Sequence, residues 1–94
     1  MSYDEIVKLI IEVLEKYFEA LGNPVQINEE TVLFGNEAVL DSMGLVNIII
    51  DIESRLMDFG VDISLTSESA MSRSRSPFRT AKTLGAYIDE ELAR

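Results

Sequence analysis

The side chain best suited to chemistry in this sequence is the hydroxyl of Ser42, which directly follows the carboxylate of Asp41. The chain contains neither cysteine nor histidine. It therefore lacks a thiol nucleophile, the imidazole that usually activates a serine, and the ligands of most zinc sites. Few enzyme mechanisms remain, so we expect no catalytic residues, no enzymatic activity and no metal site.

The Asp41-Ser42 pair also suits a purely structural role, because both residue types cap helices well. A helix is predicted to begin at Asp41 or Ser42, either of which could cap it, and to run to about Asp58 before Gly60 allows it to stop. Gly44 leaves its first turn uncrowded. Apolar side chains cover roughly 200° of this helix, whereas a surface helix typically has a stripe of about 100°. The helix is therefore expected either to lie centrally or to offer apolar surface to a ligand or partner.

Two further long helices and one short helix are predicted around it. A capping box formed by Ser2 and Glu5 begins the first helix. Thr83 is expected to cap the last, and a short third helix is expected within residues 65–71. Residues 24–40 form a long loop between the first and second helices, and a long loop inside a compact domain is often functional. The predicted fold class is all-α, a small bundle of four helices, three long plus one short.

Length and composition fit a small globular domain. With 94 residues, of which 47% are apolar and 27% charged, the chain is predicted to fold as a single domain over residues 1–94 and to be a monomer. No stretch approaches the roughly 20 apolar residues that span a bilayer, and the N-terminus is acidic rather than basic. We therefore expect no membrane span and a cytoplasmic location.

The net charge of −9 is unevenly placed along the chain. Residues 1–68 contain 14 acidic and 3 basic residues, whereas residues 69–82 contain 4 basic residues and no acidic one. Most of this surface would repel nucleic acid, so nucleic acid is not expected as a partner. A protein with a basic docking patch would be attracted to it.

A Ser-rich stretch with one proline predicts an exposed, mobile basic loop at residues 72–80. Its arginines either stay solvated or bind a specific partner or the acidic helices of the same chain; they are Arg73, Arg75 and Arg79. They are too few, on too acidic a protein, to form a nucleic-acid patch.

Residues 33–56 resemble the phosphopantetheine-attachment region of acyl carrier proteins. Their core, Leu40-Asp41-Ser42-Met43, corresponds to the Asp-Ser-Leu triplet with which that family usually opens its second helix. Here the pair follows a long first helix and a long loop, and it precedes a strongly apolar helix. The resemblance extends over nearly the whole chain in the order and length of its elements, and it implies a stand-alone, acyl-carrier-like bundle.

In that family a separate phosphopantetheinyl transferase joins the serine hydroxyl to 4′-phosphopantetheine from coenzyme A, and the thiol of this arm carries the cargo as a thioester. The resemblance implies that Ser42 is the attachment residue. It also implies that the chain presents acyl groups to acyl-loading and acyl-transferring enzymes, in fatty acid biosynthesis or in a specialised lipid or secondary-metabolite pathway. A phosphodiester at Ser42 would face unpaired N–H groups at the positive end of the helix dipole. The cofactor would supply the thiol that the chain lacks.

The family uses its second helix as a recognition surface, commonly with several acidic residues. The resemblance implies two roles for Asp41, which would cap the helix and, as in the family, place a negative charge beside the serine for transferase docking. The other matching positions here are less acidic than usual, which is consistent with a specialised carrier; they are Met43, Val46, Asn47, Ile50, Glu53 and Ser54. Core packing is the alternative role for the two aliphatic residues among them. A further apolar set could line a space for an acyl chain, although a filled core is the default for such residues: Leu33, Leu40, Leu45, Ile49, Ile52, Leu56 and Ile63.

Three alternatives stay open. An aminoacyl or D-alanyl carrier would use the same attachment logic with a different cargo. An unmodified acidic helical adaptor would bind a protein through its apolar second helix and would never gain a cofactor. A serine hydrolase is disfavoured, because no histidine can act as its base and only 3 lysines could replace one.

Overall fold

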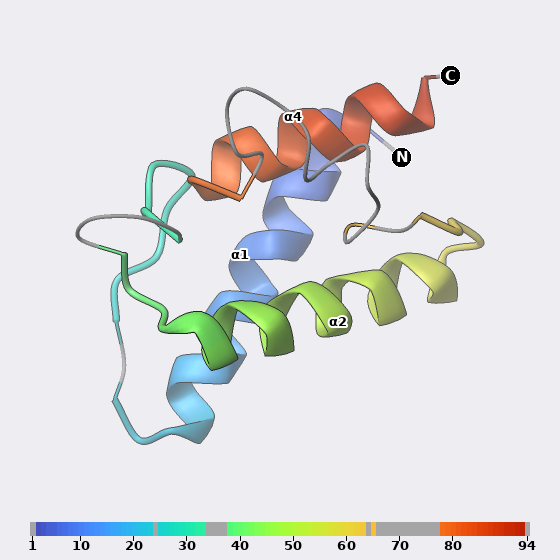
Figure 1. The fold of residues 1–94 in the computed structure, drawn as a ribbon. Helices are drawn as coiled ribbons and strands as arrows, with labels where there is room; N and C mark the ends of the chain where they lie inside the picture. Colours follow the sequence, from blue (N-terminus) through green and yellow to red (C-terminus); the bar gives the residue numbers. More distant parts are fainter. Residues whose placement is uncertain (1, 24, 34–37, 64, 66–77, 94) are drawn as a thin grey trace.

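Three helices make up the fold in the computed structural model, which describes residues 2–23, 25–33, 38–63, 65 and 78–93, with the backbone alone for Ser42. They are α1 (Tyr3–Ala20), α2 (Ser42–Asp58) and α4 (Ala81–Leu92) (Figure 1). The described residues form no β-strand, only an isolated antiparallel bridge between Val32 and Thr80. The all-α prediction is confirmed at the level of these three helices. The short helix expected within residues 65–71 lies outside the described residues, apart from Leu65, which is buried.

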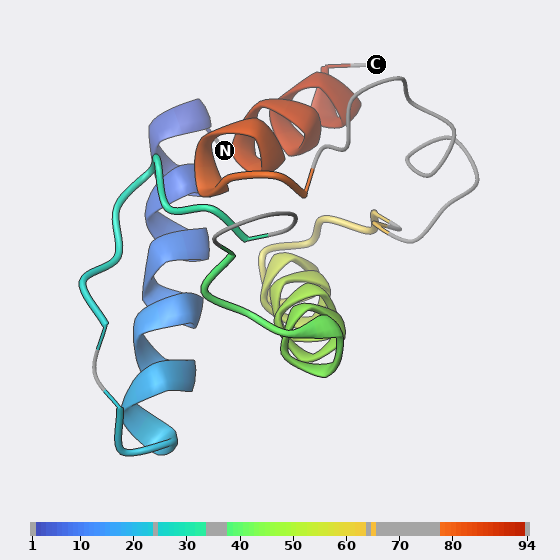
Figure 2. The ribbon, with the colours of Figure 1, turned by 60° about the vertical axis from the view of Figure 1, so that its left-hand side comes forward.

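Helix α1 is the element against which the other two pack. Figure 2 shows α2 and α4 on the same side of α1, with α4 crossing near the start of α1 and α2 crossing further along it. The predicted capping box is present: Glu5 N–H donates to Ser2 Oγ at 3.3 Å, and Ser2 N–H donates to Glu5 Oε1 at 3.0 Å. The helix ends where Gly22 adopts a φ of +73°, a left-handed conformation that glycine accepts without steric cost.

Helix α4 begins three residues earlier than the sequence predicted. Its N-cap is Thr80, whereas Thr83 occupies the third helical position. The two threonines form a reciprocal capping box, because Thr83 N–H donates to Thr80 Oγ1 at 3.1 Å and Thr80 N–H donates to Thr83 Oγ1 at 2.9 Å. The expectation that Thr83 itself is the cap was therefore wrong. Both threonines can cap a helix. Backbone hydrogen bonds between residues 79–82 and another segment of the chain decide between them.

That pairing comes from the long loop between α1 and α2. Leu33 N–H donates to the carbonyl oxygen of Arg79 at 2.7 Å. In return, two backbone N–H groups in the first turn of α4 donate to carbonyl oxygens of the loop. Ala81 N–H donates to the Thr31 carbonyl at 3.3 Å, and Lys82 N–H donates to the Glu29 carbonyl at 2.8 Å. The first N–H groups of a helix have no partner inside it. The loop therefore satisfies backbone groups of α4 and is held in place by them.

The last residues of the predicted mobile basic loop, 78–80, are built into the fold. Phe78 is buried, the Arg79 carbonyl accepts the bond from Leu33, and Thr80 caps α4. The expectation of an exposed loop was therefore wrong for Phe78, whose aromatic side chain anchors the segment in the core, whereas Arg79 is exposed and Thr80 is half-buried. Residues 72–77, including Arg73 and Arg75, lie outside the described residues.

One apolar core joins the three helices and the loop. Gly85 brings α4 close to α1, because a Cβ atom at this position would lie 2.7 Å from the Val7 Cγ2 atom. The fully buried side chains at the centre of the core come from α1, α2, α4, the interhelical loop and Leu65; they are Ile6, Ile10, Val13, Leu14, Leu33, Ile48, Ile52, Leu56, Leu65, Leu84 and Ile88. The position of α2 is therefore set by burial along its inner face.

Candidate functional site

Asp41 is the residue that caps α2, and Ser42 is the first residue of the helix. The backbone of Asp41 is extended, with φ −86° and ψ −180°, and its Oδ1 atom accepts a hydrogen bond from Gly44 N–H at 2.7 Å. Its carbonyl oxygen accepts the first intrahelical bond, from Leu45 N–H at 2.9 Å. The sequence pattern allowed either Asp41 or Ser42 to cap the helix, the resemblance favoured Asp41, and the structure assigns this role to Asp41.

The first turn of α2 combines the positive end of the helix dipole with the Asp41 carboxylate that caps it. No acidic residue lies within that turn, and helix N-termini carry a positive partial charge that attracts phosphate groups. Asp41 is exposed, and the side chain of Met43 is 73% exposed. The two neighbours of Ser42 in the sequence therefore lie at the surface, where another protein can reach this turn.

An exposed apolar stripe continues from this turn along α2. Its members are spaced by three, four and seven residues, so they share one face of the helix; they are Met43, Val46, Ile50 and Met57, with side chains 73%, 51%, 57% and 63% exposed. Asn47 is exposed beside them. The opposite face carries the buried residues Ile48, Ile52 and Leu56. The structure therefore favours the second expectation for the wide apolar arc, since α2 buries one face on the core and leaves the opposite face exposed, whereas the central helix is α1.

Glu53 differs from the other residues expected to meet partners. It is half-buried, and its Oε2 atom accepts a hydrogen bond from the backbone N–H of Leu65 at 3.1 Å. This bond ties the chain after α2 back onto the helix. Asp51, which is exposed on the same helix, forms an ion pair with Arg55, with 3.8 Å between the Asp51 Oδ1 and Arg55 Nε atoms. The structure thus gives Glu53 an anchoring role that the sequence did not indicate.

The seven residues expected to line an acyl space all belong to one apolar cluster. Five of them are buried and two, Leu45 and Ile63, are half-buried against it. The buried ones come from α2 and from the loop before it; they are Leu33, Leu40, Ile49, Ile52 and Leu56. The structure therefore brings the predicted set together, as part of the packed core.

Tyr17 is the residue of this site that sequence reasoning missed. A Cβ atom at Gly44 would lie 2.9 Å from the Tyr17 hydroxyl oxygen, 3.0 Å from Asp41 Oδ1 and 3.3 Å from Leu40 Cδ2. The sequence indicated that Gly44 leaves the first turn uncrowded, but in the structure α1 places a phenol against it. No periodicity or motif signals a contact between residues so far apart in the chain.

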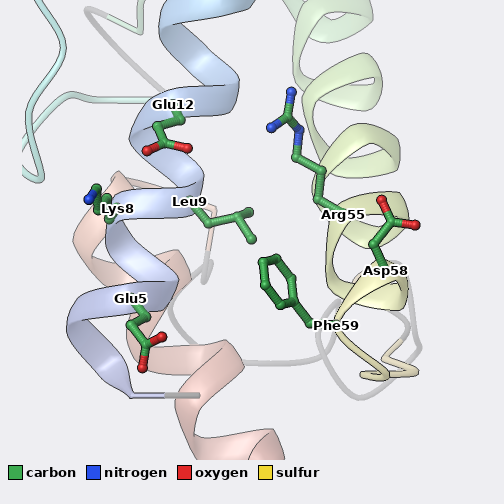
Figure 3. Close-up of a pocket in the computed structure, with 7 residues that line it drawn as sticks. All are labelled: Glu5, Lys8, Leu9, Glu12, Arg55, Asp58 and Phe59. Carbon is green, nitrogen blue, oxygen red and sulfur yellow. The ribbon is translucent and has the colours of Figure 1, made fainter.

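A groove of about 420 Å³ lies between α1 and the far end of α2. Figure 3 shows the ring of Phe59 extending from the end of α2 toward Leu9 on α1. Two basic and three acidic side chains surround this apolar floor; they are Lys8, Arg55, Glu5, Glu12 and Asp58. With a rise of about 1.5 Å per residue, Arg55, the groove residue nearest to the start of α2, lies about 20 Å along the helix from Ser42. The groove is therefore separate from the Asp41-Ser42 turn.

Comparison of the chain with protein-family models, curated proteins and solved structures finds no match. No helix in the described ranges is long and apolar enough to cross a membrane. Among these same residues, no group of three or more carboxylates is placed to hold a metal ion. The turn at Ser42 and the residues around it are therefore the features of this chain that indicate a function.

Proposed function

We propose that the chain is an acyl carrier protein that bears a 4′-phosphopantetheine arm on Ser42. The observation that carries this proposal is the first turn of α2, in which the serine is the first helical residue, Asp41 caps the helix, and the flanking residues Asp41 and Met43 are exposed. A modifying enzyme needs access to the turn that it modifies. The resemblance of residues 33–56 to the attachment region of acyl carriers supports the same assignment.

Loading is a transfer of phosphopantetheine from coenzyme A to the serine. The Ser42 oxygen forms a bond to the phosphorus atom that carries pantetheine, the diphosphate bond breaks, and 3′,5′-ADP leaves. The hydroxyl proton passes to a base of the transferase, since the chain has no histidine to accept it. The chain contributes the position of the serine and the positive end of the α2 dipole, which favours the resulting phosphodiester. Once attached, the arm would supply the thiol that holds cargo as a thioester.

Partner enzymes would dock on the outer face of α2. The apolar stripe that begins at Met43 gives such a surface, and exposed aliphatic side chains beside a modified residue are typical of interaction sites. The net charge of −9 favours partners with a basic patch. Beyond Asp41, the one carboxylate among the positions expected to meet partners is Glu53, and it accepts a hydrogen bond from the backbone N–H of Leu65. We therefore propose recognition that is more apolar than is usual for the family, as expected of a specialised carrier.

A second candidate function follows from the same stripe. An unmodified adaptor would use Val46 and Ile50, which are 51% and 57% exposed, to bind one protein and would need no cofactor. An aminoacyl or D-alanyl carrier would share the arm and differ only in cargo. The adaptor and the carriers differ in one property, because only a carrier gains covalent mass at Ser42.

The test uses coenzyme A with a fluorescent group on its thiol and a broad-specificity phosphopantetheinyl transferase. We expect the parent chain and Ser54→Ala to become fluorescent and Ser42→Ala to remain dark. Ser54 is the matched control because it is an exposed serine on the same helix. Absence of labelling in the parent, with a known carrier labelled in the same reaction, would reject the carrier and favour the adaptor.

A further inference from the structure

We infer that Tyr17 is a positioning residue for the modification of Ser42, and that it acts through Gly44 and Asp41. This inference rests on the proposed function. It assigns a role to a residue of α1 that lies outside the attachment motif. The phenol of Tyr17 lies against the first turn of α2 at the point where Gly44 has no side chain.

The ring of Tyr17 is held by its neighbours in α1. It is half-buried and makes an edge-to-face contact with Phe18, with ring centroids 5.3 Å apart and planes inclined by 82°. Phe18 is itself buried in the core. Aromatic pairs in this geometry attract each other beyond the burial of their surfaces. The hydroxyl of Tyr17 is therefore presented to α2 from a restrained ring.

The Tyr17 hydroxyl and the Asp41 carboxylate both border the small space beside Gly44. The Tyr17 oxygen and the Asp41 Oδ1 atom lie 2.9 Å and 3.0 Å from the point where a Cβ atom of residue 44 would stand. The same Oδ1 atom accepts the capping bond from Gly44 N–H at 2.7 Å. A side chain at position 44 would therefore displace the phenol, the capping carboxylate or the turn itself. Ser42 lies between the cap and Gly44, so its position depends on this packing.

Loading should depend on where the first turn of α2 places the Ser42 hydroxyl. Transfer to a serine requires the oxygen to approach phosphorus in line, and small displacements of a reacting group lower the rate strongly. Displacing the cap should therefore lower kcat of the transferase more than it raises KM, because docking on the stripe is unchanged. A role confined to stability would alter the fraction of folded chain and not the kinetics of the folded chain.

The experiment is a double-mutant cycle on loading, with Tyr17→Phe, Gly44→Ala and the double variant, using the fluorescent coenzyme A. We expect Gly44→Ala to lower kcat/KM by at least about fivefold, because misplacing a reacting group by about 1 Å can cost about 100-fold in rate. The double variant should recover at least about twofold of that loss, since the methyl group takes the space left by the hydroxyl. Urea unfolding of each variant shows that loading is measured on folded chain.

Gly85→Ala is the matched control. It also crowds a helix crossing on α1, where the new Cβ atom would lie 2.7 Å from Val7 Cγ2, but it lies at the other end of α1. It should lower stability and leave kcat/KM unchanged in folded protein. Additive effects of Tyr17→Phe and Gly44→Ala, parental loading of Gly44→Ala, or an equal loss in Gly85→Ala would overturn this inference alone. Failure of the parent to load beside a known carrier would overturn the proposed function, and this inference with it.

Discussion

The carboxylate of Asp41 accepts a hydrogen bond from the backbone N–H of Gly44 at 2.7 Å, and this bond fixes the start of the helix whose first residue is Ser42. Asp41→Ala should lower the free energy of unfolding by about 0.5–2 kcal/mol, because a first-turn N–H loses its acceptor. Asp41→Asn should retain most of that stability, since asparagine caps as well as aspartate. Urea denaturation measures both, and equal losses in the two variants would contradict the capping role.

The Glu53 carboxylate should slow hydrogen exchange in the chain that follows α2. Glu53→Ala removes the acceptor of Leu65 N–H and should lower the free energy of unfolding by about 1.5–3 kcal/mol, the range for a hydrogen bond to a charged group. Glu53→Gln retains a side-chain oxygen and should cost less. Hydrogen exchange at the Leu65 amide should accelerate in the alanine variant. Exchange that is unchanged in both variants would show that this bond does not hold the segment.

Truncating adjacent residues on the two faces of α2 should change stability by very different amounts. Ile50 is 57% exposed and Ile49 only 4%, so Ile50→Ala should alter stability by less than about 0.5 kcal/mol, whereas Ile49→Ala should cost about 2–5 kcal/mol. The affinity of the transferase for the chain should fall in Ile50→Ala if the apolar stripe is the docking surface. Unchanged KM in Ile50→Ala, measured with labelled coenzyme A, would move docking away from this face.

The start of α1 should make stability depend on pH in the acid range. The pKa of Glu5 is lowered from its ordinary value of 4.5 because the backbone N–H of Ser2 donates to its carboxylate. A depressed folded-state pKa means that the contribution is present above about 4.5 and is lost as pH falls through the folded value. Glu5→Gln should therefore flatten the acid limb of stability against pH. An NMR titration that finds Glu5 at or above its ordinary pKa would refute this.

Features encoded by neighbouring residues could be predicted from the sequence. The Ser2 and Glu5 capping box lies within one turn, so its pattern alone indicated where α1 begins. The apolar periodicity of α2 likewise indicated a helix to Asp58, which is where the structure ends it. Such signals are reliable because the interacting groups are fixed by the geometry of a single helix.

Features that depend on distant segments could not be predicted in this way. The start of α4 at Thr80 depends on pairing with residues 29–33, and Thr80 and Thr83 are equivalent without that pairing. The bond from Leu65 to Glu53 and the packing of Tyr17 on Gly44 also join separate parts of the chain. The motif thus located the candidate site, while the groups that position it follow only from the tertiary fold.

The site of modification gives the sharpest test of the proposed carrier. The chain is incubated with unlabelled coenzyme A and a broad-specificity phosphopantetheinyl transferase, and intact mass is followed by fragmentation of the modified protein. We predict a gain of one phosphopantetheine group, located on Ser42 and absent from Ser42→Ala. A group located on another residue, or no gain while a known carrier is loaded in the same tube, would contradict the assignment.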